Sequence, residues 1–64
     1  MENWQDHITS DSTILLGKPI IKGTRISVEF ILERLASGWN EEQILENYPR
    51  LTSDDIRAVR WFRL

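Results

Sequence analysis

The stretch that decides the fold spans residues 39–56, which read WNEEQILENYPRLTSDDI. It contains two helix starts of the same kind, Asn40 with Gln43 and Thr52 with Asp55, each pair three residues apart. At such a start the first side chain caps backbone N–H groups of the first turn, and the second reaches back to the cap. The stretch therefore predicts two helices joined by a tight turn.

Apolar pairs flank both caps. Trp39 with Ile44 and Leu51 with Ile56 occupy the positions of a hydrophobic staple, which fixes the angle at which the chain enters a helix. Pro49 ends the earlier helix, because the residue before a proline is pushed out of helical geometry. The two predicted helices cover residues 41–47 and 53–64.

A further helix is predicted upstream, over residues 28–37. Ser27 is a plausible N-cap, and Gly38 stands where a left-handed residue ends a helix. The apolar positions between them follow helical spacing: Val28, Ile31, Leu32 and Leu35. Residues 27–64 are thus expected to form a three-helix helix-turn-helix unit.

The first 26 residues have a different pattern. Three short β-prone pieces, Ile8–Thr9, Thr13–Leu16 and Ile20–Lys22, are separated by turn-forming residues. We expect a short hairpin or a pair of strands, with Gly17, Pro19, Gly23 and, after the first helix, Gly38 as structural turn residues. The prediction is a mainly α single domain over residues 1–64, with a β/turn segment at 1–26.

Composition excludes several classes of protein. The 64 residues carry a net charge of −2, no cysteine and one histidine, so disulfides, thiolate metal sites and two-histidine metal sites are excluded, and no cofactor is expected. The start Met-Glu-Asn-Trp does not resemble a signal peptide, and no apolar run approaches the length of a membrane span. We expect a cytoplasmic protein with no membrane partner.

No residue pattern favours catalysis. Gly17 and Lys18 fail as a phosphate-binding loop because Pro19 follows them instead of a serine or threonine. His7 lies near Asp6 and near further acidic and hydroxyl side chains, the residue types used in nucleophilic catalysis. Because it lies close to a chain end, without a scaffold to orient it, His7 is expected to be solvated. The chain is predicted not to be an enzyme.

Some side chains fall outside the apolar helix faces. Phe30 lies opposite the main face of its helix, where either the N-terminal strands cover it or another chain contacts it. Trp61 lies beside arginines, either as an interface anchor with Leu64 or flat on its own domain beneath an arginine. These three residues are the candidate protein contacts.

The basic residues define the candidate phosphate contacts. The last eight residues contain three arginines and no acid, whereas residues 27–56 contain two basic and seven acidic residues. In a helix-turn-helix, the start of the last helix meets the bases, and here Asp54 and Asp55 oppose that contact. DNA binding is therefore permitted by the fold and weakened by charge. The candidates are Arg25, Arg57, Arg60 and Arg63.

The chain closely resembles a small bacterial family catalogued as domain of unknown function four-three-three, within the homeodomain-like helix-turn-helix group. The resemblance covers roughly residues 7–60 and is most specific at Gly17-Lys18-Pro19 and Gly23-Thr24-Arg25-Ile26. It continues at Ile31-Leu32, Ala36–Trp39, Tyr48-Pro49 and Leu51-Thr52. Two positions depart from the pattern: Leu16 stands where a second glycine is usual, and Ser12 where proline is common. Many members also continue beyond the position of Leu64.

Members of this family often look like antitoxins of type II toxin–antitoxin pairs. The resemblance implies that the chain binds and neutralises a PIN-like ribonuclease toxin, and that it represses its own operon by binding operator DNA. A DNA-binding regulator without a toxin and a protein-interaction module of another role are the alternatives. The small core, the unsupported strands and the placement of Phe30 and Trp61 favour a homodimer.

Overall fold

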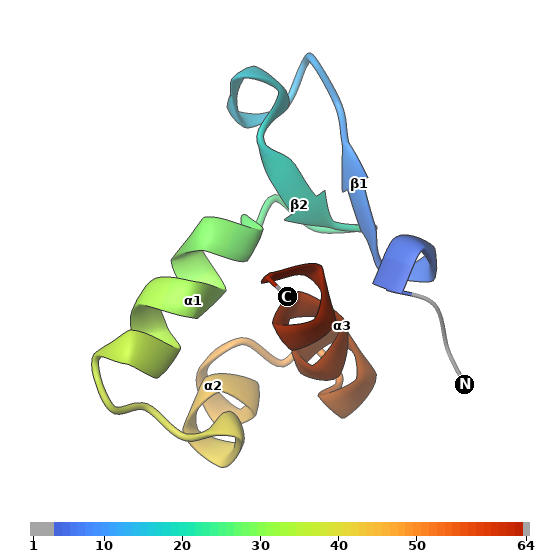
Figure 1. The fold of residues 1–64 in the computed structure, drawn as a ribbon. Coiled ribbons are helices and arrows are strands. Elements are labelled where there is room, and N and C mark those ends of the chain that lie inside the picture. Colours follow the sequence, from blue (N-terminus) through green and yellow to red (C-terminus); the bar gives the residue numbers. More distant parts are fainter. Residues whose placement is uncertain (1–3, 64) are drawn as a thin grey trace.

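The computed structural model describes residues 4–63. Leu64 and the side chain of Arg63, two of the predicted contact groups, lie outside the described part. Within it, a two-stranded hairpin precedes three helices, as the sequence predicts (Figure 1).

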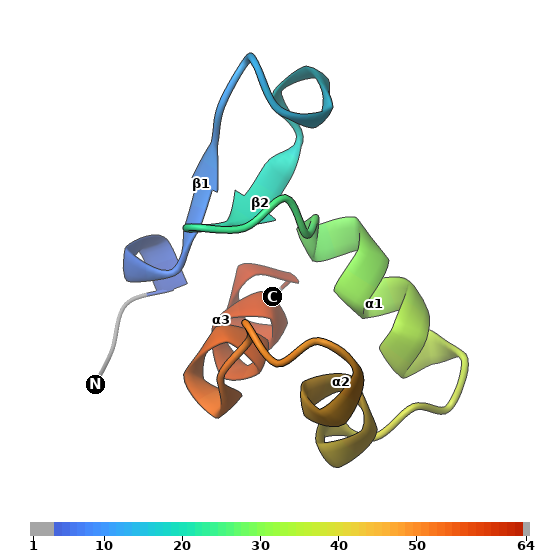
Figure 2. The ribbon, with the colours of Figure 1, turned by 180° about the vertical axis from the view of Figure 1, so that it is seen from behind.

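The hairpin pairs β1 (Ile8–Ser10) with β2 (Pro19–Ile21) in antiparallel register, so that Ile8 lies opposite Ile21. A short 3₁₀ turn, Trp4–Asp6, precedes β1. The hairpin lies across one end of the helices, and its tip points away from them (Figures 1 and 2). Ile20 also forms an antiparallel bridge to Ser27, which ties β2 to the start of the first helix.

The three helices are α1 (Val28–Ala36), α2 (Glu41–Asn47) and α3 (Ser53–Arg63). The α2 bounds agree with the prediction, and α1 ends one residue early at its C-cap, Ser37. Gly38 has a φ of 96°, which confirms the predicted left-handed residue after α1.

The predicted caps form the expected hydrogen bonds. Phe30 N donates to Ser27 Oγ over 2.9 Å. Asn40 and Gln43 form a complete capping box, with N–O distances of 2.8 and 2.9 Å. Each satisfied cap is worth about 1 kcal/mol, which matters for helices as short as α2.

The third predicted cap also forms, and it connects to the hairpin. Asp55 N donates to Thr52 Oγ1 over 3.2 Å, and Thr52 N donates to Asp55 Oδ2 over 3.0 Å. The other carboxylate oxygen, Oδ1, lies 2.9 Å from Nδ1 of His7. The prediction of a solvated His7 is therefore wrong. Its side chain is 18% exposed, and its partner lies 48 residues away in the sequence.

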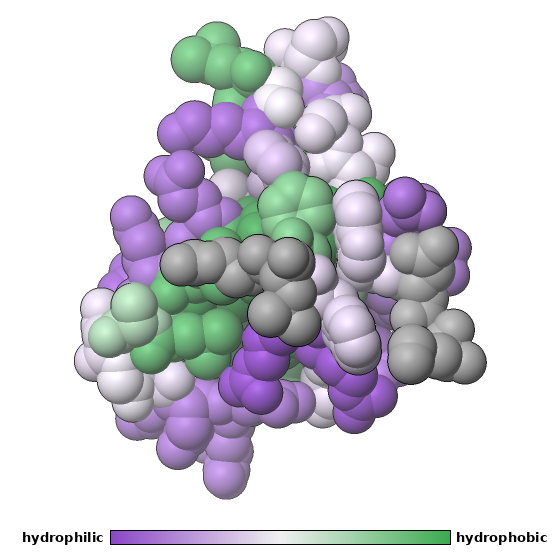
Figure 3. Space-filling model, viewed as in Figure 1, coloured by the Kyte–Doolittle hydropathy of each residue, from purple (hydrophilic) through white to green (hydrophobic). Residues whose placement is uncertain are grey.

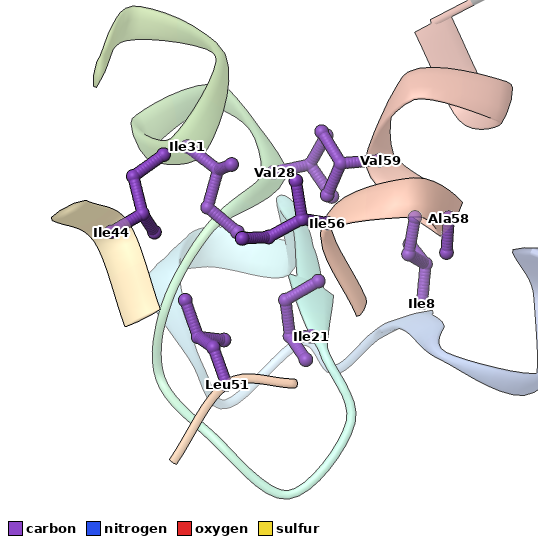
Figure 4. Packing of buried hydrophobic residues seen from close by; sticks show 9 residues of the cluster. All are labelled: Ile8, Ile21, Val28, Ile31, Ile44, Leu51, Ile56, Ala58 and Val59. Carbon is purple, nitrogen blue, oxygen red and sulfur yellow. The ribbon is translucent and has the colours of Figure 1, made fainter. Parts of the chain in front are cut away.

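One core is shared by the hairpin and the helices (Figure 4). Ile8 and Ile21 from the two strands belong to the same cluster as side chains of all three helices, and Ile8 lies near Ala58 of α3. The buried cluster is completed by Val28, Ile31, Ile44, Leu51, Ile56, Ala58 and Val59. Because the strands bury their apolar side chains here, the hairpin does not need to be stable by itself.

The β-prone piece Thr13–Leu16 does not form a strand. Residues 15–17 form a 3₁₀ turn at the hairpin tip, in which Leu15 and Leu16 have positive φ angles. Pro19 does not lie in this turn either, because it is the first residue of β2, a strand position that proline tolerates.

We predict that Asp55→Ala lowers the free energy of unfolding by about 2 kcal/mol or more, because it removes the acceptor of Thr52 N at the start of α3 and the carboxylate that holds His7. Urea denaturation followed by circular dichroism measures the change. Asp54→Ala is the matched control. Its exposed pair with Arg57 is expected to contribute less than about 1 kcal/mol. Equal effects of the two substitutions would contradict the role of Asp55.

Candidate protein-binding surface

Two adjacent leucines project from the hairpin tip into solvent. Leu15 is 45% exposed and Leu16 is 95% exposed. Figure 3 shows hydrophobic atoms projecting at this tip, beyond the body of the molecule. Full burial of a leucine is worth about 1.5–3 kcal/mol, and Leu16 gains almost none of it within its own chain.

The backbone of the tip is strained. Leu15, Leu16 and Gly17 have φ angles of 47°, 57° and 81°, so three consecutive residues are left-handed. For a residue with a Cβ atom this region costs roughly 1–2 kcal/mol, whereas glycine adopts it freely. The tip is held in place by hydrogen bonds from Gly17 N to Ile14 O and from Lys18 N to Leu15 O, at 3.0 and 3.2 Å.

The tip is continuous with two hollows in the surface. One, of about 310 Å³, is lined by Leu15, Leu16, Lys18 and Ser27. The other, of about 370 Å³, is lined by Leu15, Arg25, Ile26, Ser27, Phe30 and Tyr48. We call Leu15, Leu16, Phe30 and Tyr48 the tip surface, because Leu15 joins the two hollows.

Phe30, a predicted protein contact, lies on this surface. Its ring meets that of Tyr48 edge to face, with centroids 5.3 Å apart, and the guanidinium of Arg34 lies 4.6 Å from its centroid. These ring partners come from α1 and the end of α2 rather than from the strands. Phe30 is half-buried, and it keeps one side toward the hollow that it shares with Leu15.

Trp61, the other described candidate contact, belongs to a different part of the surface. It is 48% exposed on α3, while the neighbouring Phe62 packs edge to face against Trp4 at 4.9 Å. Among the described residues, the arginine that stacks on aromatic rings is Arg34, on Phe30 and Trp39, and not one beside Trp61. The alternative in which an arginine covers Trp61 is not observed among these residues.

The described candidate phosphate contacts, Arg25, Arg57 and Arg60, come from two separate parts of the chain. Arg57 and Arg60 lie exposed on α3, and Arg57 is 3.3 Å from Asp54. Arg25 lies before α1, where it lines a separate hollow together with Arg50. Sequence reasoning missed Arg50, because nothing in the sequence pattern brings residue 50 to residue 25.

The turn before α1 explains the Gly23-Thr24-Arg25 motif in structural terms. Gly23 has a φ of 79°, as predicted for a turn residue. The Thr24 hydroxyl donates to Ile21 O over 2.8 Å and accepts from Ile26 N over 3.0 Å. Threonine therefore satisfies two backbone groups and sets the direction in which Arg25 leaves the turn.

Residues 4–63 contain no group of three or more His, Cys, Asp or Glu side chains arranged to hold a metal ion. No helix in this range is long and apolar enough to cross a membrane.

A hairpin packed on three capped helices, with an apolar surface at the hairpin tip, defines a small domain of the hairpin and helix-turn-helix class. The chain belongs to the family described as "Protein of unknown function (DUF433)", whose model matches residues 8–62. The family resemblance inferred from the sequence is thereby confirmed.

The chain is also similar to one curated protein and to one solved structure. It is 38% identical over 52 residues to the uncharacterized protein y4eO of Sinorhizobium fredii (strain NBRC 101917 / NGR234). This match covers 81% of the chain and 24% of the relative. The crystal structure of a DUF433 member protein from Anabaena variabilis ATCC 29413 is similar with a TM-score of 0.85 and 29% identity. It covers 91% of the chain and 57% of the solved one, so the present chain spans only part of both relatives.

We predict that Leu16→Gly stabilises the isolated domain by about 1 kcal/mol, because glycine adopts the left-handed backbone without a Cβ clash and little burial is lost. Thermal unfolding followed by circular dichroism measures the effect. Glu33→Gly, at an exposed position inside α1, is the control and is expected to destabilise by roughly 0.5 kcal/mol or more. A loss of stability in Leu16→Gly would show that this side chain supports the fold itself.

Proposed function

We propose that this chain is a non-catalytic protein-binding domain and that it acts as the antitoxin of a type II toxin–antitoxin pair, neutralising a PIN-like ribonuclease. The observation that carries the proposal is the pair of leucines held exposed on a left-handed backbone at the hairpin tip.

Backbone strain at position 16 is not offset by burial within the chain. A leucine at position 16 costs roughly 1–2 kcal/mol of backbone strain relative to glycine. It returns almost no burial within the chain, since 95% of the side chain is exposed. Contact with another protein would supply the missing free energy of burial, because it removes the same apolar surface from water. Strained backbone positions that persist in this way are typical of functional sites.

Phe30 and Tyr48 extend the same surface with aromatic side chains. Aromatic residues dominate the energetics of protein interfaces, because they bury a large area with few rotatable bonds. Trp61 on α3 forms a second candidate anchor. A toxin in contact with both regions would touch the hairpin tip and the last helix.

Self-association is the competing use of the tip surface. In a homodimer, which the sequence favours, two tips would cover each other with two-fold symmetry. Light scattering on the chain alone gives the mass, and the same measurement after co-expression with the product of the neighbouring gene gives the composition of any complex. The antitoxin proposal requires a stable complex with a PIN-like protein.

We predict that Leu16→Asn weakens the complex with the PIN-like protein by about 2 kcal/mol, as truncation of an interface anchor does. Asparagine tolerates the left-handed backbone, so the hairpin tip keeps its shape while its apolar side chain is lost. Trp61→Ala, which removes the second anchor, is expected to weaken binding by a similar amount. Titration calorimetry on the purified partners measures both changes.

Glu46→Gln is the control for that titration, because Glu46 is exposed on α2 and lines none of the hollows described above. Unchanged affinity in Leu16→Asn would remove the tip from the interface. Unchanged affinity in Trp61→Ala would remove α3 only.

Operator binding is the second proposal, and it is favoured by the two exposed arginines on α3. Arg57 and Arg60 lie three residues apart on one helix, where both can reach a phosphate backbone. Asp54 already neutralises Arg57 in part, so Arg60 is the stronger contact.

We predict that Arg60→Ala reduces the slope of log K against log salt by about one, measured by gel shift on the DNA upstream of the gene. Lys22→Ala, a loss of the same charge on the exposed turn after β2, serves as the control. Binding that does not depend on salt, or no binding at low salt, would exclude the DNA role.

A further inference from the structure

A third hollow, of about 360 Å³, lies between the hairpin and the turn that precedes α3. We call it the arginine hollow, because Arg25 and Arg50 both line it. The remaining lining residues are Thr9, Asp11, Ile14, Ile20, Gly23 and Thr24. Its lining includes neither the helix-capping residues nor the two leucines of the tip surface.

Arg25 and Arg50 have no hydrogen-bond or ion-pair partner among the described residues. Neither guanidinium forms a hydrogen bond or an ion pair with any side chain or carbonyl of residues 4–63, whereas Arg57 pairs with Asp54 and Arg34 stacks on two rings. Both side chains are exposed and line a common hollow, so their N–H donors are open to a ligand in exchange for water. Guanidinium groups bind carboxylates and phosphates through paired N–H donors.

One acid offsets part of this charge. The Thr13 hydroxyl donates to Asp11 Oδ1 over 2.6 Å, and Thr13 N donates to the same oxygen over 2.8 Å. These hydrogen bonds and the nearby charge of Arg25 hold the pKa of Asp11 below its usual value, so that it is ionised at neutral pH. Two arginines and one aspartate give the hollow a net charge of +1. This charge matches a monoanion better than a phosphate dianion.

Arg25 places an apolar surface next to the proposed anion site. Arg25 lines both the arginine hollow and the hollow of Phe30 and Tyr48. A ligand that places an anion against Arg25 and Arg50 therefore has an apolar and aromatic surface directly beside it. Few monoanions meet both requirements: an acidic side chain next to an apolar one in a peptide, or a phosphodiester next to a base.

We propose that the arginine hollow binds an aspartate or glutamate side chain of the partner protein, whose adjacent apolar side chain rests against Phe30 and Tyr48. The inference rests on the proposed protein-binding function and specifies the chemistry of the partner segment. The charge of the domain favours a protein over a nucleic acid. The chain carries −2 overall, and residues 27–56 contain seven acids and only two basic residues, one of them Arg50, so a polyanion at this hollow meets an acidic segment.

The test uses the full chain and a minimal probe of the stated chemistry. The capped dipeptide Ac-Asp-Phe-NH₂ carries one carboxylate and one ring, and Ac-Asn-Phe-NH₂ lacks only the charge. Each is titrated to about 20 mM against ¹⁵N-labelled chain, a range suited to exposed ion pairs, which are individually weak. The backbone resonances of Gly23, Thr24 and Arg25 are followed by NMR.

The charged dipeptide is expected to shift these resonances and to bind about fivefold more tightly than its asparagine analogue. Arg25→Gln and Arg50→Gln are each expected to reduce its affinity by a similar factor. Lys22→Gln removes the same charge from an exposed residue outside the hollow and is expected to leave the affinity unchanged. An unchanged spectral dispersion in each variant shows that it is folded.

Three results would overturn the inference: no shift in these resonances, an equal effect of Lys22→Gln and Arg50→Gln, or tighter binding of the dinucleotide TpT. The last result would assign the hollow to a phosphodiester. Because the titration uses the chain alone, it is independent of co-expression. A failed titration with an intact toxin complex removes this inference only, and a failed co-expression removes the proposed function.

Discussion

The carboxylate of Asp55 holds together the two parts of the domain. One of its oxygens accepts from the backbone of Thr52 and completes the start of α3, and the other contacts His7 at the entry to β1. Asp55 is only 9% exposed, so these contacts form where few water molecules compete. A single side chain thereby fixes the start of the last helix and the base of the hairpin at the same point.

This anchoring explains how a hairpin of three-residue strands can present a strained tip. Ile8 and Ile21 at the base of the hairpin belong to the common core, while the tip lies at the opposite end of the strands. The core and the His7–Asp55 contact stabilise the base, so the cost at Leu15 and Leu16 does not unfold the hairpin. A tip that is rigid before binding loses less conformational entropy on contact with a partner. The proposed recognition of another protein accounts for both the strain and the exposure of these leucines.

The local parts of this structure could be predicted from the sequence, and the parts that depend on distant residues could not. Caps such as Asn40 with Gln43 depend on neighbours three residues away, so the helix starts follow directly from the residue types. Ile14, Leu15 and Leu16 are apolar residues that favour a strand. Backbone hydrogen bonds to the carbonyl oxygens of Asp11 and Ile14 instead bend this segment into a turn. A leucine at a position where glycine is usual was the available signal of left-handed backbone. The burial of His7 could not be predicted because its partner, Asp55, is remote in the sequence. Arg50 could not be singled out for the same reason, since Arg25 lies far from it along the chain.

Amide hydrogen exchange tests the central claim most directly, with the chain compared alone and in complex with the proposed PIN-like partner. The account predicts that the complex slows exchange at residues 14–17 and around Phe30, where the tip surface is exposed in the free chain. Capture of no partner, or protection confined to α3 with unchanged exchange at residues 14–17, would contradict it.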